Sequence, residues 1–120
     1  MEKVNIGLIK SEDFGAKIMN LYPILTARKV PFRVREQLVG SGTSIGANLF
    51  EAQYGISSKD FLAKIYISLK ECYETIYWLR LLYRTDYISN DEFTSYYSEA
   101  EEILKILIST TKTLKQNSSE

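Results

Sequence analysis

The chain of 120 residues is long enough for one compact core and too short for two ordinary domains. Its 45% apolar and 25% charged residues indicate a globular protein, and its 15 cationic and 15 anionic side chains exclude an overall attraction to nucleic acid or anionic lipid. The chain has no histidine, which excludes Ser-His-Asp and Cys-His catalysis, histidine-based zinc sites and the Glu-x-x-His pairs of di-iron bundles.

Helical periodicity dominates the pattern, and its first stretch predicts a helix over about residues 11–28. Ser11 is placed to cap its start, and Glu12 and Asp13 would lie in the positive first turn. Pro23 lies inside this stretch, where it removes one backbone hydrogen bond and is expected to bend the helix. The predicted buried stripe consists of Phe14, Ile18, Leu21 and Leu25.

The second predicted helix runs over about residues 31–54, because Pro31 suits the first helical position and Gly55 suits the residue just past the end. Gly42 and Gly46 lie one turn apart inside it, and each lowers helix propensity by about 1 kcal/mol. We therefore expect another helix to pack closely against them. The apolar stripe is Val34, Leu38, Gly42, Ile45, Leu49 and Ala52.

The third predicted helix runs over about residues 58–84, and Ser57 with Asp60 forms a capping box at its start. Its inner stripe is Phe61, Ile65, Leu69, Cys72, Ile76, Leu79 and Tyr83. A second stripe lies at an angle to the first and consists of Tyr66, Tyr73 and Tyr77, with Trp78 beside it. This stripe suits an interface between copies of the chain. The alternative is that the tyrosines lie half exposed on a monomer.

The fourth predicted helix runs over about residues 89–115, where Ser89 and Glu92 form a second capping box. Its apolar seam is Phe93, Tyr97, Ala100, Leu104, Leu107, Thr111 and Leu114. Short connections favour antiparallel neighbours, so the sequence predicts an all-α, antiparallel up-down-up-down four-helix bundle forming a single domain over residues 1–120.

Several segments, in order along the chain, resemble the bacterial four-helix-bundle family named for the 23S rRNA intervening-sequence protein. The densest is the run Ser41-Gly42-Thr43-Ser44-Ile45-Gly46-Ala47-Asn48, followed by Glu51-Ala52-Gln53. One branch of the family carries the same residues at Asp60-Phe61, Lys64, Leu69-Lys70-Glu71, Glu74-Thr75 and Tyr77-Trp78-Leu79. The resemblance covers roughly Phe14 to Lys115.

This resemblance implies a bundle that assembles into a homo-oligomer, in known relatives often a pentameric ring. Some members of the family are encoded in insertions within large-subunit rRNA genes. A similar accessory protein of diversity-generating retroelements binds nucleic acid and a reverse transcriptase. Two departures stand out, Pro23 in the first helix and the neutral overall charge, and the second weakens the expectation of nucleic-acid binding.

The densest basic cluster joins the first two predicted helices and consists of Arg28, Lys29, Arg33 and Arg35. A loop at this junction would present several cations to the phosphates of a nucleic acid. The more ordinary interpretation is a solvated loop with surface charge, since only Phe32 lies among the cations as a possible stacking ring.

Other polar residues of the family run are Ser41, Ser44, Asn48 and Glu51. Asn48 and Glu51 share a helical face and, with Arg35, admit a catalytic interpretation, but such residues more often satisfy one another at a helix interface. No catalytic residue is therefore assigned.

Three further features have both a functional and a structural interpretation. Glu71 and Glu74 share a helical face, but no second inward pair completes a metal site, so no metal is assigned. Tyr73 and Tyr77 would suit base stacking, although core or interface burial is more common. Cys72 fits a small core residue in a reducing compartment.

These observations predict a non-enzymatic, homo-oligomeric scaffold of the bacterial cytoplasm that binds RNA or an RNA-processing protein. The expectation of RNA binding follows from the family resemblance. The alternative is a structural protein–protein interaction module without nucleic-acid binding. No cofactor, membrane contact or small-molecule substrate is inferred.

Overall fold

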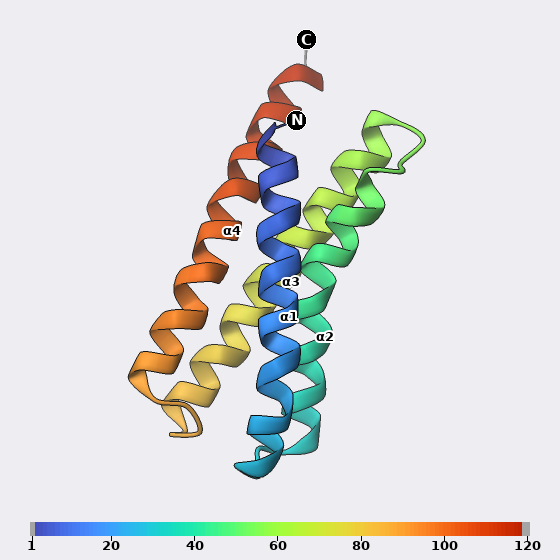
Figure 1. Cartoon of the computed structure of the whole chain (residues 1–120). Helices are drawn as coiled ribbons and strands as arrows, with labels where there is room; N and C mark the ends of the chain where they lie inside the picture. Colours follow the sequence, from blue (N-terminus) through green and yellow to red (C-terminus); the bar gives the residue numbers. More distant parts are fainter. Residues whose placement is uncertain (1, 119–120) are drawn as a thin grey trace.

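The fold was obtained as a computed structural model, which describes the backbone of residues 2–118 and the side chains of residues 5–116. Four helices make up the described chain: α1 (Glu2–Ala27), α2 (Phe32–Ala52), α3 (Ser58–Arg84) and α4 (Asn90–Ser118). Each helix runs back alongside the one before it, and α1 begins at the end of the bundle where α4 finishes (Figure 1). The prediction of an all-α four-helix bundle is confirmed.

The helices surround one elongated core, with α1 in contact with α2 and α4, and α3 in contact with α2 and α4. The bundle measures 50 × 23 × 19 Å. The predicted stripes point into this core, since Leu38, Ile65 and Leu107 are each no more than 1% exposed. Burying each such side chain contributes roughly 1.5–3 kcal/mol to stability. The predicted stripe of the first helix is also buried throughout: Phe14, Ile18, Leu21 and Leu25.

The start of α1 differs from the prediction, because the helix begins at Glu2 and not near Ser11. Ser11 is buried inside the helix, and its hydroxyl donates to the carbonyl of Leu8 at 3.0 Å, so it caps nothing. Gly7 continues the buried stripe one turn earlier, and a Cβ there would meet Ile106 at 3.3 Å. A glycine that signals a helix break in the sequence is here a small residue at a helix contact.

The ends of α2 also differ from the prediction. Pro31 occupies the N-cap position, and the first helical residue is Phe32. The helix stops at Ala52, and none of the described glycines, Gly55 included, has a positive φ. Gly55 instead donates its N–H to the Ala52 carbonyl at 3.2 Å in a right-handed turn. The prediction that Gly55 is the residue directly after the helix is therefore wrong, because the C-cap is Gln53.

Left-handed residues do end two other helices, and both are non-glycine residues. Lys29 follows α1 with φ 63°, and Asp86 follows α3 with φ 64°. After α1, the N–H of Val30 donates to the Leu25 carbonyl at 3.0 Å, which completes a Schellman motif. Val30 and Leu25 are both buried, so the hydrophobic contact of that motif offsets the left-handed backbone.

The caps of α3 and α4 agree with the sequence. The Ser57 hydroxyl accepts from the Asp60 N–H at 3.1 Å, and α3 has the predicted bounds. Before α4, the Ser89 hydroxyl accepts from the Glu92 N–H at 3.1 Å. The Glu92 carboxylate accepts from the Ser89 N–H at 2.8 Å in return. These bonds satisfy backbone donors that a helix start leaves unpaired.

Candidate interaction surfaces

The glycines of the family run lie where α2 packs against α1. A Cβ at Gly42 would lie 2.9 Å from Cγ2 of Ile18. A Cβ at Gly46 would lie 3.4 Å from the backbone carbonyl carbon of Ser11. The two helices therefore approach closely at these positions, which explains why small residues are needed there.

Ser41 of the same run faces α3. The Ser41 and Thr75 hydroxyl oxygens lie 2.9 Å apart, and both residues are buried. The Ser68 hydroxyl donates to the Ile45 carbonyl at 2.8 Å across the same interface. The run thus packs against two helices at once, and the Ser41 hydroxyl is satisfied inside the bundle.

The remaining polar members of the run contact their own helix or α3. The Asn48 side chain donates to the Ser44 carbonyl at 2.8 Å, and Glu51 forms an ion pair with Lys64 at 2.7 Å. Arg35 is not part of this group, because its Nε donates to the Val30 carbonyl near the start of α2. The structure therefore does not bring Arg35, Asn48 and Glu51 together.

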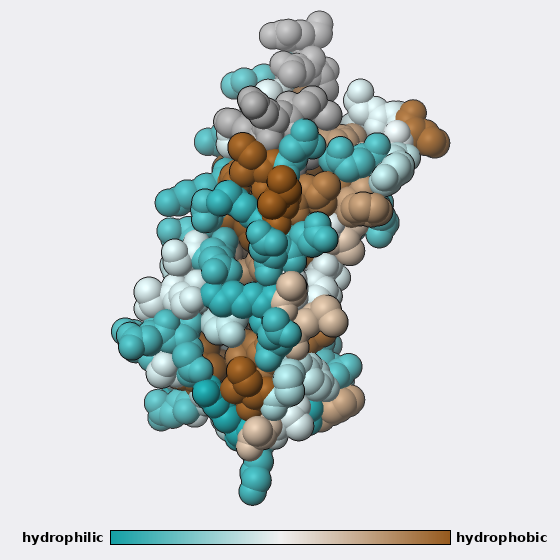
Figure 2. Space-filling view, viewed as in Figure 1, coloured by the Kyte–Doolittle hydropathy of each residue, from teal (hydrophilic) through white to brown (hydrophobic). Residues whose placement is uncertain are grey.

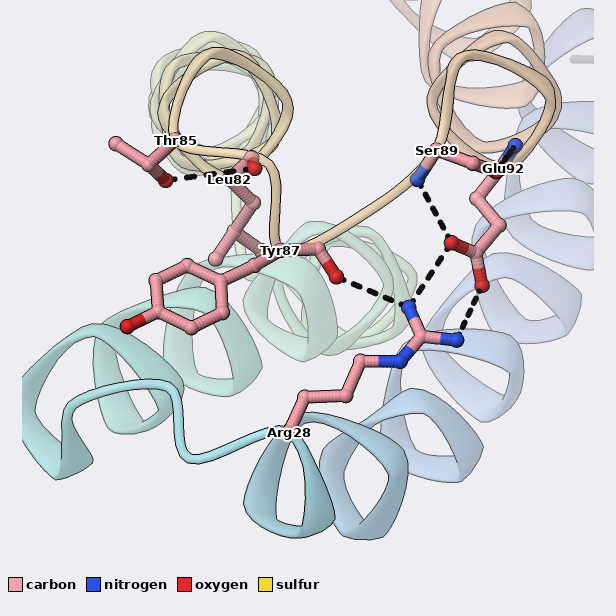
Figure 3. A network of polar contacts seen from close by, with 6 residues as sticks. All are labelled: Arg28, Leu82, Thr85, Tyr87, Ser89 and Glu92. Atoms are coloured by element: carbon pink, nitrogen blue, oxygen red, sulfur yellow. Dashed lines mark hydrogen bonds and ion pairs between the residues drawn. The ribbon is translucent and has the colours of Figure 1, made fainter.

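The first cation of the predicted basic cluster joins three parts of the bundle (Figure 3). Both terminal nitrogens of Arg28 donate to the Glu92 carboxylate at 2.9 Å, and Nη1 also donates to the Tyr87 carbonyl at 3.0 Å. Hydrogen bonds from Arg28 and from the Ser89 backbone lower the pKa of Glu92 to about 2. Arg28 thus links the end of α1 to the start of α4.

The last cation of the cluster is also engaged within the chain. Besides its bond to Val30, Arg35 donates to the Thr26 hydroxyl at 2.9 Å, and its guanidinium lies over the rings of Tyr22 and Phe32. Within the part of the chain that the structure describes, Lys29 and Arg33 are exposed and have no polar partner. Of the four cations in this cluster, only these two are free to contact a phosphate.

The predicted interface tyrosines lie on the outer side of α3, with Tyr73 53% and Tyr77 54% exposed. The Lys115 ammonium of α4 lies 5.7 Å from the centre of the Tyr66 ring, and Tyr77 and Trp78 pack edge to face at 5.2 Å. Burial of these rings between copies stays a prediction.

The sequence reasoning missed the cations that share this face of α3. Lys70 and Arg80 recur with the tyrosines at steps of three and four residues, and both are exposed. A search for basic residues at helical spacing would have found them, whereas a search for adjacent basic residues favours the loop after α1.

An apolar groove of ≈ 380 Å³ lies between α1 and α2. Met19 and Phe50 stand at its edges, 60% and 55% exposed. Its other lining residues are Leu8, Ser11, Glu12, Gly15, Ala16, Thr43 and Gly46. Gly15 and Gly46, which lie at the close contact between the two helices, are among the residues that line it.

The α1–α4 seam is polar by contrast. Figure 2 shows this side of the bundle, where hydrophilic side chains cover much of the line between the two helices. Lys10 pairs with Glu102 and Lys17 pairs with Glu99, so carboxylates of α4 are neutralised by cations of α1.

The acidic pair of α3 does not extend into a metal centre. Burial, together with the neighbouring Glu74 carboxylate, raises the pKa of Glu71. Among the described residues there is no group of three or more potential metal-ligating side chains.

None of the described helices is both long and apolar enough to cross a membrane.

Comparison with known proteins gives a consistent assignment. No curated protein matches the chain. A crystal structure of a protein of unknown function from the S23 ribosomal protein family of Bacteroides thetaiotaomicron is similar at 44% identity and a TM-score of 0.88. The match covers 92% of this chain and 98% of that one. Residues 5–109 match the family described as 23S rRNA-intervening sequence protein. The chain therefore belongs to the 23S rRNA-intervening sequence protein family.

Proposed function

We propose that the protein is a non-enzymatic, homo-oligomeric scaffold that binds RNA or an RNA-processing protein. The observation that carries the scaffold role is the exposed apolar surface, above all the groove that Met19 and Phe50 border. Exposed apolar groups gathered around a groove are typical of contact sites for other macromolecules. The proposed RNA binding is supported by the family, whose name refers to 23S rRNA.

The chemistry of the polar residues supports binding rather than catalysis. Ser41 and Thr75 contact each other, Asn48 bonds to its own helix, and Glu51 pairs with Lys64. Side chains held in this way stabilise the packing of α2 and are not poised against a substrate.

Self-association is tested by light scattering on a sizing column at micromolar protein concentration. We expect a mass several times that of one chain, with five copies as the number that the family resemblance implies. Two surfaces are available to a second copy, the α1–α2 groove and the rings at Tyr66, Tyr73, Tyr77 and Trp78. A monomeric mass contradicts the proposal.

RNA binding is tested by measuring affinity for a structured RNA while the salt concentration is raised. The logarithm of the affinity should fall linearly with the logarithm of salt concentration, because bound cations release counterions from phosphates. Substitution of Lys29 and Arg33 by glutamine tests the loop cluster without disturbing Arg28 and Arg35, which stabilise the fold. An unchanged affinity in this variant excludes the loop cluster as the contact site.

The alternative function is a protein–protein interaction module without nucleic-acid binding. It is favoured by one observation, that Arg28 and Arg35 are engaged within the chain and leave the loop cluster weakly basic. An assembled protein that retains no RNA even at low salt would support this alternative over the RNA-binding scaffold.

A further inference from the structure

Cations and tyrosines share one exposed face of α3. Their positions recur at steps of three, four or seven residues, so they fall within about 80° of the helix circumference. Every one of them is exposed. We name this set the α3 stripe: Lys59, Tyr66, Lys70, Tyr73, Tyr77, Arg80 and Arg84.

No carboxylate occupies a position of the α3 stripe. Asp60 and Glu71 project at other angles around the helix, and Glu74 falls just beyond the edge of the stripe. Glu74 lies beside Glu71, whose carboxyl group also interacts with Lys70. The stripe is therefore a row of positive charges with aromatic rings between them.

Helix α4 extends this positive surface. Lys115 lies over the Tyr66 ring, and the exposed Lys112 and Lys105 follow at helical spacing on the same side of α4. Glu101 is the acidic exception, and it lies 3.5 Å from Lys105. The positive surface thus spans α3 and the adjoining edge of α4.

The packing of the bundle explains how a chain with no net charge has such a face. The α4 carboxylates Glu92, Glu99 and Glu102 point the other way, where they pair with two cations of α1 and with Arg28, which follows it. Their negative charge is neutralised at the α1–α4 seam and does not offset the cations on α3.

We propose that the α3 stripe binds single-stranded RNA, with its cations on phosphates and Tyr73 and Tyr77 stacked on bases. The proposal rests on the RNA binding of the proposed function and assigns that binding to a surface. Aromatic rings alternating with cations are the usual means of holding an unpaired strand without sequence preference. A paired strand offers its phosphates but not its base faces, so the exposed rings favour single-stranded over double-stranded RNA.

The length of the stripe suits several nucleotides. At 1.5 Å per helical residue, Lys59 and Arg84 are about 37 Å apart along the axis, and Tyr66 and Tyr77 about 16 Å. Phosphates of a stacked strand recur every 3.4 Å or so, so the stripe spans roughly ten nucleotides.

A second copy of the chain that meets this surface with its own α3 stripe fits less well. A symmetric contact would bring the Lys70 and Arg80 side chains of both copies together, and like charges at an interface oppose association. RNA, by contrast, supplies the negative charge that the face needs.

The test is fluorescence anisotropy with a labelled, unstructured 12-nucleotide RNA, measured on the full-length protein over a series of salt concentrations. One variant removes charge, Lys70→Gln with Arg80→Gln, and one removes rings, Tyr73→Leu with Tyr77→Leu. The matched control, Lys29→Gln with Arg33→Gln, removes the same charge from the loop after α1. Circular dichroism verifies that each variant is folded.

The two stripe variants should change different quantities, the salt dependence of the affinity in one and the affinity alone in the other. Loss of the cations should reduce the slope of log affinity against log salt by about 1.4, since each phosphate contact on a single strand contributes about 0.7. Loss of the two rings should weaken binding by about thirtyfold or more with an unchanged slope, since each stacked base contributes about 1 kcal/mol or more. The charge-preserving pair Lys70→Arg and Arg80→Lys should bind as the parent protein does.

The outcomes separate the stripe from the proposed function. If the parent binds RNA and only the loop control weakens it, the stripe is the wrong surface and the RNA function stands. If the parent binds no RNA at low salt, both the stripe assignment and the RNA binding of the proposed function are overturned. If the stripe variants change the oligomer mass but not RNA affinity, a second copy occupies this face and the stripe assignment is wrong.

Discussion

The carboxylate of Glu92 acts on two helices at once. It accepts the Ser89 N–H at the start of α4, and it receives both terminal nitrogens of Arg28 from the end of α1. Charge-assisted, bidentate bonds of this kind are among the stronger polar contacts in proteins. One acidic side chain therefore caps a helix and joins the first and last helices of the bundle.

This contact should make stability depend on pH in a defined direction. The folded pKa of Glu92 is lowered to about 2, below the value of about 4.3 in an unfolded chain. Its contribution is therefore complete above pH 5 and is lost as the pH falls toward 2. Because the side chain is 32% exposed, we expect only about 1 kcal/mol.

Urea unfolding of the parent and of Glu92→Gln at pH 7, 4 and 2.5 measures this contribution. The variant should be less stable at pH 7, and the difference should shrink at pH 2.5. Glu12→Gln removes a carboxylate from an exposed position of α1 and serves as the control. A difference that is constant across the three pH values would show that the Arg28 contact is not the cause.

Cys72 illustrates the opposite case, a group made inert by its surroundings. Burial raises the pKa of its thiol to about 12, and Sγ lies 3.4 Å from the Ala100 carbonyl. The nucleophilic thiolate is therefore scarce at pH 8. Ellman's reagent should react slowly with the folded protein and rapidly in denaturant, and fast reaction under native conditions would contradict the buried position.

At the scale of the helix, α2 depends on glycine where it meets α1. Gly42→Ala gains helix propensity but places a methyl group 2.9 Å from the branched Ile18 side chain. Overpacking of this kind typically costs about 1–3 kcal/mol. Gly40 lies on the same helix, and a Cβ there meets nothing within 4 Å. Gly40→Ala should therefore stabilise by about 0.5–1 kcal/mol.

If this packing is correct, thermal unfolding should show a lower melting temperature for Gly42→Ala and a higher one for Gly40→Ala than for the parent. Equal stabilisation by the two substitutions would mean that α1 moves away from α2 without penalty. The comparison isolates the contact because both substitutions change the same residue type within one turn of α2.

The sequence predicts helix interiors better than helix ends. Capping boxes are local, so Ser57 and Ser89 mark the starts of α3 and α4 correctly. The end of α1 uses Lys29 in the left-handed conformation, which depends on Val30 burying itself against Leu25. A residue type that rarely adopts this conformation gives no signal of it in the sequence.

At the scale of the whole molecule, the fold was predictable and the charge distribution was not. Apolar periodicity identified the buried stripes because it reports a property of each helix alone. The positive face depends on which carboxylates α1 neutralises, and ion pairs such as Lys17 with Glu99 join residues far apart in the chain. Arg28 shows the same limit, since its partner Glu92 lies on another helix.

The last prediction concerns the groove between α1 and α2. If this groove is the centre of a contact between copies, Met19→Lys with Phe50→Lys should lower the oligomer mass, because buried lysines would lose hydration without a partner. The control Ile24→Lys changes an exposed apolar residue of the same helix that does not line the groove. Light scattering at matched concentrations compares the three proteins. Retention of the parent mass by the double variant, or an equal loss in the control, would remove the groove as the assembly surface. If the groove is the assembly surface, the α3 stripe would stay open to RNA, and the two faces of the bundle would then separate assembly from RNA binding.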